Sequence, residues 1–230
     1  MLELTPLETE ALGLSLRVAL WSVAVSLPFG LAVAWLLARY DFFGKTVLNV
    51  VVHLPLVLPP VVVGYMLLIL FGRQGALGAW LYASFGVSLA FTWEGAALAA
   101  AVMAFPLMVR AMRLSIETVD RKLETAARTL GASRANVFVT ITLPLIMPGI
   151  LAGAVLAFAR SLGEFGATIT FVSNIPQETR TLPLALYSLI QSPSGEAGAL
   201  RLVVLSVLLS LAALGASEAI ARRLRARISD

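Results

Sequence analysis

Residues 123–144 read LETAARTLGASRANVFVTITLP, a polar stretch inside an otherwise apolar chain. Its apolar side chains recur with the spacing of one helical face, at Leu123, Ala126, Ala127 and Leu130. Gly131 follows, at the position where many helices end in a left-handed conformation. The pattern predicts a short helix with a shallow apolar stripe, because alanine side chains let another protein approach the backbone closely.

Capping residues divide this stretch into two short helices. Asp120 is a candidate N-cap for the first helix, and Ser133 for a second helix that carries Val137, Phe138 and Ile141. Pro144 is expected to stop the second helix, since proline lacks a backbone N–H. Two helices around a glycine turn form a plausible docking element for another protein.

Two other interpretations of residues 123–144 stay open. A glycine-containing turn between helices is also typical of DNA-binding helix-turn-helix motifs, and a polar stretch can be a plain solvated loop. Apolar segments flank the stretch closely, which disfavours a separate DNA-binding domain. The apolar stripe and its caps favour an ordered docking element over a plain loop.

The composition places the chain in a membrane. Of its 230 residues, 59% are hydrophobic and 13% are charged, whereas soluble domains carry about 25% charged residues. Cysteine is absent, which excludes disulfides and thiolate metal sites. The only histidine, His53, cannot form a metal site by itself and is expected to be a hydrogen-bonded helix residue. A membrane surface, rather than nucleic acid, accounts for the net charge of +4.

Five apolar segments are long enough to cross a bilayer as helices, which takes about 20 residues each. They cover residues 12–38, 46–71, 93–112, 145–170 and 200–220. The shorter apolar segment 181–192 is expected to be interfacial or re-entrant. The first segment is too long for a signal peptide core and has an acidic flank, so we expect it to remain in the mature protein. That flank contains Glu3, Glu8 and Glu10.

The basic residues predict the orientation. With the C-terminus in the cytoplasm, the cytoplasmic side holds Arg39, Lys45, Arg110, Arg113, Arg121, Lys122, Arg128, Arg134, Arg222, Arg223, Arg225 and Arg227. The outer side then holds Arg73, Arg180 and Arg201. The positive-inside rule therefore places the N-terminus outside and residues 123–144 in the cytoplasm.

Charged residues inside the fourth segment raise the question of a transport pathway. Arg160 and Glu164 are four residues apart, so they share a helical face and can neutralise each other. An unpaired charge would be costly in lipid, so the two must face protein or water. A structural ion pair and a pathway-lining role are equally open. The candidate pathway residues are Arg160, Ser161, Glu164, Thr168, Thr170, Pro59 and Pro60.

Prolines and glycines predict distortion and close packing. Pro55, Pro59 and Pro60 should distort the second segment. Similar distortion is expected in other segments at Pro28, Pro106 and Pro148. Broken helices can line a cavity, although packing alone also accommodates them. Gly149 and Gly153 permit close helix contact, either within the chain or between two subunits.

No ATP site is expected in this chain. Gly44-Lys45-Thr46 resembles the end of a P-loop, but the first glycine of that motif would fall at Arg39. We expect no catalytic, cofactor-binding or metal-binding residues. Any ATP that the chain depends on must then be bound by another subunit.

From Ala126-Ala127 onward, residues 123–144 resemble the EAA loop of ABC-importer permeases. That pattern is E-A-A, three residues, G, nine residues and I-x-L-P, and Gly131 and Ile141-Thr142-Leu143-Pro144 keep its spacing. Thr125 stands where the family commonly has glutamate, and Glu124 lies one residue early.

Three further segments are similar to the molybdate-permease (ModB) family of ABC importers across nearly the whole chain. They are HLPLVLPPVVVGY (53–65), AAAVMAFPLMVRA (99–111) and FARSLGEFGATITFVSNIPQETRT (158–181).

This resemblance implies an all-α integral membrane protein of the MetI-like ABC permease fold. Residues 1–230 would form one transmembrane domain with five transmembrane helices and a cytoplasmic coupling loop at 113–144. The implied activity is translocation of molybdate, and of tungstate, across the bacterial inner membrane. In this family the coupling helix docks onto an ATPase. The positions that match that helix are Glu124, Ala126, Ala127, Leu130, Gly131 and Ala132.

Other subunits are implied as partners. The resemblance implies ModC-type ATPase subunits, which hold the ATP and Mg, and a ModA-type extracytoplasmic molybdate-binding protein. Each chain supplies one docking loop, whereas an importer has two ATPases. This difference favours a homodimer. Loops 72–92 and 173–199 are the expected surface for the binding protein. Membrane lipid is a further partner, and nucleic acid is not expected.

Three alternatives to molybdate import remain. Sulfate and thiosulfate permeases of the same superfamily are the nearest relatives of this pattern. An ion-coupled secondary transporter would ordinarily carry more paired intramembrane charges and would work without ATP. A membrane sensor would bind its cytoplasmic partner but transport nothing.

Overall fold

The computed structural model describes the backbone of residues 5–229, and the side chains of residues 5–216 and of Ala219. Glu3 and the side chains of Arg222, Arg223, Arg225 and Arg227 lie outside the described residues. The regular elements of this part of the chain are all helical. Those of membrane-spanning length are α1 (Pro6–Arg39), α5 (Trp93–Thr118), the continuous helix from Arg134 to Leu162, and α11 (Glu196–Ser229).

The remaining helices are shorter. The continuous helix consists of α7 (Arg134–Val137), the π-helix η1 (Phe138–Thr142) and α8 (Leu143–Leu162). The others are α2 (Lys45–Val57), α3 (Pro60–Phe71), α4 (Ala76–Phe85), α6 (Arg121–Thr129), α9 (Gly166–Val172) and α10 (Leu182–Ile190).

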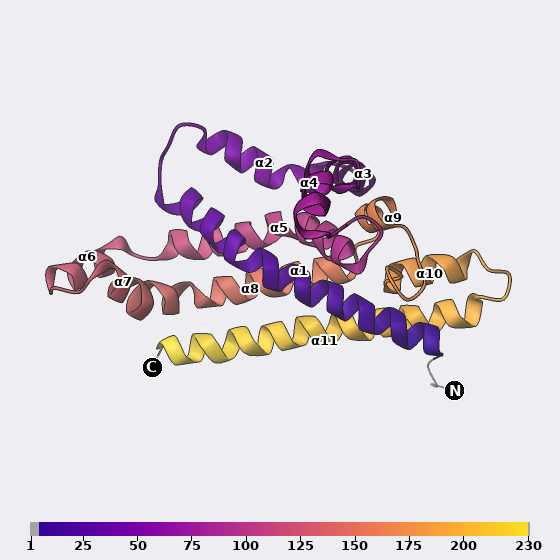
Figure 1. Cartoon of the computed structure of the whole chain (residues 1–230). Helices are drawn as coiled ribbons and strands as arrows, with labels where there is room; N and C mark the ends of the chain where they lie inside the picture. Colours follow the sequence, from indigo (N-terminus) through magenta and orange to yellow (C-terminus); the bar gives the residue numbers. More distant parts are fainter. Residues whose placement is uncertain (1–4, 230) are drawn as a thin grey trace.

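The long helices form a bundle with two distinct ends (Figure 1). One end, called the α6 end below, carries α6, α7 and the C-terminal part of α11. The other, called the α10 end, carries the start of α1 together with α9 and α10. Helix α5 packs against both α1 and α8, and 61% of its most apolar stretch is buried. In α11 the corresponding fraction is 6%, so α11 lies at the periphery.

The second apolar segment is a broken span rather than one helix. Helices α2 and α3 are bent by 115°. Leu58 and Pro59 between them are extended, with ψ values of 143° and 133°. A residue that precedes proline avoids helical conformation, and both of these residues do so. The distortion expected from Pro59 and Pro60 is therefore confirmed. The prediction of one continuous span over 46–71 was wrong, because this segment forms two helices.

The fourth apolar segment differs from expectation at both ends. Pro144 does not stop the preceding helix, because the chain remains helical from Arg134 to Leu162. The π-helical turn explains this continuity: Leu143 N–H bonds to the carbonyl of Phe138, five residues earlier, so the wider turn gives the proline ring room. At the other end, α8 stops at Leu162 instead of reaching residue 170.

The remaining boundaries extend beyond the expected spans. Helix α1 begins with a capping box between Thr5 and Glu8, six residues before position 12. Helix α5 continues past residue 112 to Thr118, where Ile116 is still buried. Helices α1, α5 and α8 run on through Pro28, Pro106 and Pro148, and α2 runs on through Pro55, so the distortion expected at these prolines does not break the helices. Packing in a bundle lets membrane helices accommodate such prolines.

The close contact expected from Gly149 and Gly153 lies within the chain. A Cβ atom on Gly149 would overlap the side chain of Ser115, and one on Gly153 would press against the carbonyl of Met108. Both neighbours belong to α5. These glycines therefore bring α8 against α5 in the same subunit.

Candidate docking and translocation sites

The turn between α6 and α7 is fixed by local hydrogen bonds. The Asp120 carboxylate accepts a bond of 2.8 Å from Lys122 N–H, and the Ser133 hydroxyl accepts one of 3.2 Å from Asn136 N–H. Gly131 has a φ of +91°, a conformation that suits glycine. Both predicted caps and the predicted left-handed glycine are confirmed.

Helix α6 presents an uncovered face. It contains no buried residue, and Leu123, Ala126 and Leu130 of the predicted stripe are exposed. Leu123 and Leu130 are 50% and 90% exposed. Ala127 and Ala132 are half-buried and Gly131 is exposed. Five of the six predicted docking residues are thus accessible on or next to α6, and their role stays a prediction.

The sixth, Glu124, is turned towards the body of the protein. Its carboxylate lies 2.7 Å from the guanidinium of Arg39, at the end of α1, and accepts a 2.8 Å hydrogen bond from the hydroxyl of Thr142 in η1. The side chains of Arg39 and Glu124 are 9% and 15% exposed. Glu124 thus joins α6 to α1 and to the helix that continues as α8. Sequence reasoning missed Arg39 and Thr142 as its partners.

Aromatic side chains reinforce this junction. The Arg39 guanidinium lies 5.1 Å from the centroid of the Trp35 ring. Trp35 in turn meets Phe138 edge to face, with centroids 5.4 Å apart. Such arrangements add favourable electrostatic contact to apolar burial.

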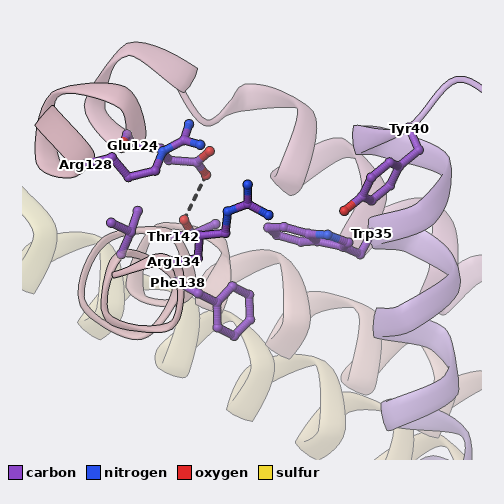
Figure 2. A pocket seen from close by; sticks show the side chains of 8 residues that line it. Trp35, Tyr40, Glu124, Arg128, Arg134, Phe138 and Thr142 are labelled. Atoms are coloured by element: carbon purple, nitrogen blue, oxygen red, sulfur yellow. Dashed lines mark hydrogen bonds between the residues drawn. The ribbon is translucent and has the colours of Figure 1, made fainter. Parts of the chain in front are cut away.

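A cavity of about 340 Å³ opens beside the junction, between the end of α1, helix α6 and the α7–η1 segment. Figure 2 shows Arg128 and Glu124 on one side of it, Arg134, Phe138 and Thr142 below, and Trp35 and Tyr40 opposite. Its wall is therefore part cationic and part aromatic.

The two charged residues of the fourth apolar segment form an ion pair. Arg160 and Glu164 lie 2.7 Å apart, and the Glu164 side chain is 1% exposed. Glu164 also accepts a 2.8 Å bond from Ala167 N–H, which caps the start of α9. Gly163 and this cap explain why α8 ends at Leu162.

The other candidate pathway residues do not share one open face. Ser161 and Thr168 are buried; Ser161 bonds to Ser22 of α1, and Thr168 to the carbonyl of Phe165. Thr170 bonds to the carbonyl of Gly166 and is half-buried. Arg160 and Pro60 are half-buried, whereas Pro59 is exposed. A pathway role for these residues stays a prediction.

Each arginine expected on the outer side has a partner. Arg73 donates to the Tyr82 hydroxyl, and Arg180 to the Asn174 side chain. Arg201 pairs with Glu8 at 2.9 Å across α1 and α11. Arg180 and Arg201 line a cavity of about 310 Å³ at the α10 end.

Two residues singled out in the sequence have ordinary structural roles. Lys45 of the P-loop look-alike pairs with Asp41 at 2.8 Å. His53 shares a 2.8 Å hydrogen bond with the carbonyl of Asn49, as expected for a helix residue.

Comparison with known proteins settles the family. Residues 26–226 match the family model described as "Binding-protein-dependent transport system inner membrane component". This chain belongs to that family.

Individual relatives of this transport family refine the match. The chain is 63% identical over 224 residues to the molybdenum transport system permease protein ModB of Escherichia coli (strain K12), covering 97% of this chain and 98% of that protein. The sulfate transport system permease protein CysT of the same organism is 40% identical over 184 residues, covering 79% of this chain and 66% of that one.

Structural similarity confirms the fold expected for a family member. A structure of the MetNI methionine ABC transporter aligns with a TM-score of 0.71 at 16% identity, covering 95% of this chain and 96% of that one. The chain is therefore a multi-pass membrane permease with the MetI-like fold predicted from its sequence.

Proposed function

We propose that this chain is the membrane-spanning subunit of an ATP-driven importer of molybdate. The observation that carries the proposal is the 63% identity to a molybdenum permease over almost the full length of both chains. The sulfate permease match is lower and shorter, so a sulfate importer is the weaker alternative. Membership of a binding-protein-dependent family also argues against an ion-coupled carrier and against a sensor.

The orientation follows from charge. We place the α6 end in the cytoplasm, because Arg121, Lys122, Arg128 and Arg134 are all exposed there. The α10 end, with Arg180 and Arg201, then faces outward. The membrane in question is the bacterial inner membrane, and the N-terminus lies on its outer side.

The assembly contains other subunits. Two ModC-type ATPases, which bind ATP and Mg, dock at the exposed stripe of α6, one for each copy of the chain in a homodimer. A ModA-type binding protein delivers the oxyanion to the α10 end. The exposed stripe on α6 supports the ATPase contact, because it is uncovered within the described chain.

Uptake by the reconstituted complex tests the proposed function. Proteoliposomes should contain this chain, its ATPase and its binding protein, and should accumulate radiolabelled molybdate only when ATP is supplied. Excess sulfate should leave the uptake unchanged. Uptake without ATP would exclude an ABC importer, and strong competition by sulfate would assign the chain to the sulfate branch.

The docking stripe leads to a separate prediction. Ala126→Trp should lower recovery of the ATPase with the purified permease by about tenfold or more, because a bulky ring then occupies a shallow contact. Ala126 is exposed, so the permease itself should fold normally. Gly131→Trp is a less clean test, since a φ of +91° strains any residue other than glycine.

The matched control is Ala83→Trp, which adds the same ring at an exposed alanine of α4. Co-purification of the ATPase is measured for both variants at equal permease levels. Normal ATPase recovery with Ala126→Trp would refute docking at the α6 stripe.

A further inference from the structure

The cavity at the α6 end has an excess of positive charge. Of the described residues, Arg128 and Arg134 line it, and the one carboxylate among the lining residues, Glu124, is already bonded to Arg39 and Thr142. Arg134 makes no ion pair with another described side chain. Within the described part of the chain, Arg128 donates one hydrogen bond, from its Nε to the Glu124 carbonyl at 3.2 Å. Several guanidinium N–H groups therefore remain available to an anion.

The arrangement of these groups suits a phosphate. Figure 2 shows Arg128 reaching in from α6 and Arg134 from α7, so that two guanidinium groups approach one cavity from different helices. Guanidinium groups bind phosphate oxygens through paired, charge-assisted hydrogen bonds. A volume of about 340 Å³ lies at the lower end of the range for small-ligand pockets, about 300–1,000 Å³, which suits a phosphate headgroup.

Aromatic side chains line the cavity beside its two arginines. Trp35 and Phe138 form the aromatic part of the wall. Tyr40, which also lines the cavity, is 57% exposed at its outer edge. Tryptophan and tyrosine are enriched where membrane spans meet the headgroup layer, and Trp35 and Tyr40 stand at the end of α1. A ligand bound to the two arginines can thus place apolar chains against Trp35 and Tyr40 at the end of α1.

We propose that this cavity binds the phosphate headgroup of an anionic phospholipid from the leaflet at the α6 end. The shared chemistry is a phosphate oxyanion held by Arg128 and Arg134. The aromatic side chains Trp35, Tyr40 and Phe138 favour a lipid over free phosphate, because they offer contacts to the apolar part of a lipid at the headgroup layer. The proposal rests on the placement of the α6 end at the cytoplasmic membrane surface, and it does not depend on the transported anion.

Lipid retention by the purified full-length chain tests this site. The protein is equilibrated in mixed micelles of phosphatidylglycerol and phosphatidylcholine, and the retained lipids are counted by native mass spectrometry. The wild-type chain should prefer phosphatidylglycerol. Arg128→Gln/Arg134→Gln should reduce that preference by roughly tenfold or more, as expected for the loss of two basic contacts. The single variant Arg134→Gln should give an intermediate loss.

The charge-matched control is Arg121→Gln/Lys122→Gln, which removes two exposed basic residues of α6 that do not line the cavity. It should retain phosphatidylglycerol as the wild-type chain does. An equal loss in both double variants, or no loss in either, would overturn the cavity as the site.

A second arm separates lipid from free phosphate. Inorganic phosphate at millimolar concentration should not displace phosphatidylglycerol from the wild-type chain. Displacement would assign the cavity to free phosphate and refute a lipid site. Because retention is measured without ATP, binding protein or molybdate, a failure of this proposal is distinct from a failure of the proposed transport function.

Discussion

Glu124→Gln is expected to lower ATP-driven molybdate uptake by roughly tenfold while the permease stays bound to its ATPase. A tenfold effect lies within the range typical of coupling between distant sites. The change removes the anion that holds Arg39 at 2.7 Å and weakens the bond with Thr142. Breaking a buried ion pair costs about 3–5 kcal/mol, because the remaining charge is left unpaired. Helix α6 would then move without carrying α1 and η1 with it.

The measurement compares ATP hydrolysis with uptake in the same proteoliposomes. ATP hydrolysis should persist in Glu124→Gln while molybdate uptake falls. The matched control is Glu117→Gln, which breaks the ion pair between Arg113 and Glu117 on the more exposed surface of α5. Because exposed pairs contribute little, this control should behave as the wild type.

Two outcomes would contradict this role of Glu124. Wild-type uptake by Glu124→Gln would show that the ion pair does not transmit motion. Loss of the ATPase from the purified variant would instead assign Glu124 to the docking surface, as the resemblance to the EAA loop implies.

Arg160→Met is expected to destabilise the permease, because we expect the ion pair between Arg160 and Glu164 to be primarily structural. The Glu164 side chain is 1% exposed, so removal of its cation leaves a buried carboxylate without a charge partner. The expected loss of stability is about 3 kcal/mol, at the lower end for buried pairs because the Arg160 side chain is 28% exposed. Thermal unfolding of the detergent-purified chain measures it.

Rescue by a second substitution distinguishes structure from transport. Arg160→Met/Glu164→Gln removes both charges and should recover most of the lost stability, since a neutral amide is less costly to bury. The glutamine introduced by Glu164→Gln keeps an oxygen that can accept the bond from Ala167 N–H. A variant Arg160→Met with normal unfolding but no uptake would show that Arg160 acts on the transported anion.

The sequence predicted the fold well because strong local signals carry it. Long apolar runs identify the spans, and Asp120, Gly131 and Ser133 mark the α6–α7 turn through hydrogen bonds to nearby residues. The bend at Pro59-Pro60 was also predicted, since proline restricts its neighbours whatever the surroundings.

The features that were missed depend on distant contacts or on competing local effects. The inward direction of Glu124 depends on Arg39, 85 residues away in the chain. Pro144 reads as a helix stop, yet the chain stays helical by forming a π-helical turn. Gly163 indicates a helix end after Leu162, but the apolar residues on both sides of it led to the prediction of a continuous helix.

The continuity of the helix from Arg134 to Leu162 has a mechanical consequence. Its 29 residues give a rod about 43 Å long at 1.5 Å per residue. Tilting such a rod by about 5° around one end displaces the other end by about 4 Å, roughly the width of a methyl group. Movement of α7 at one end of the bundle is thereby delivered along one continuous helix to Ser161 and the Arg160–Glu164 pair at its far end.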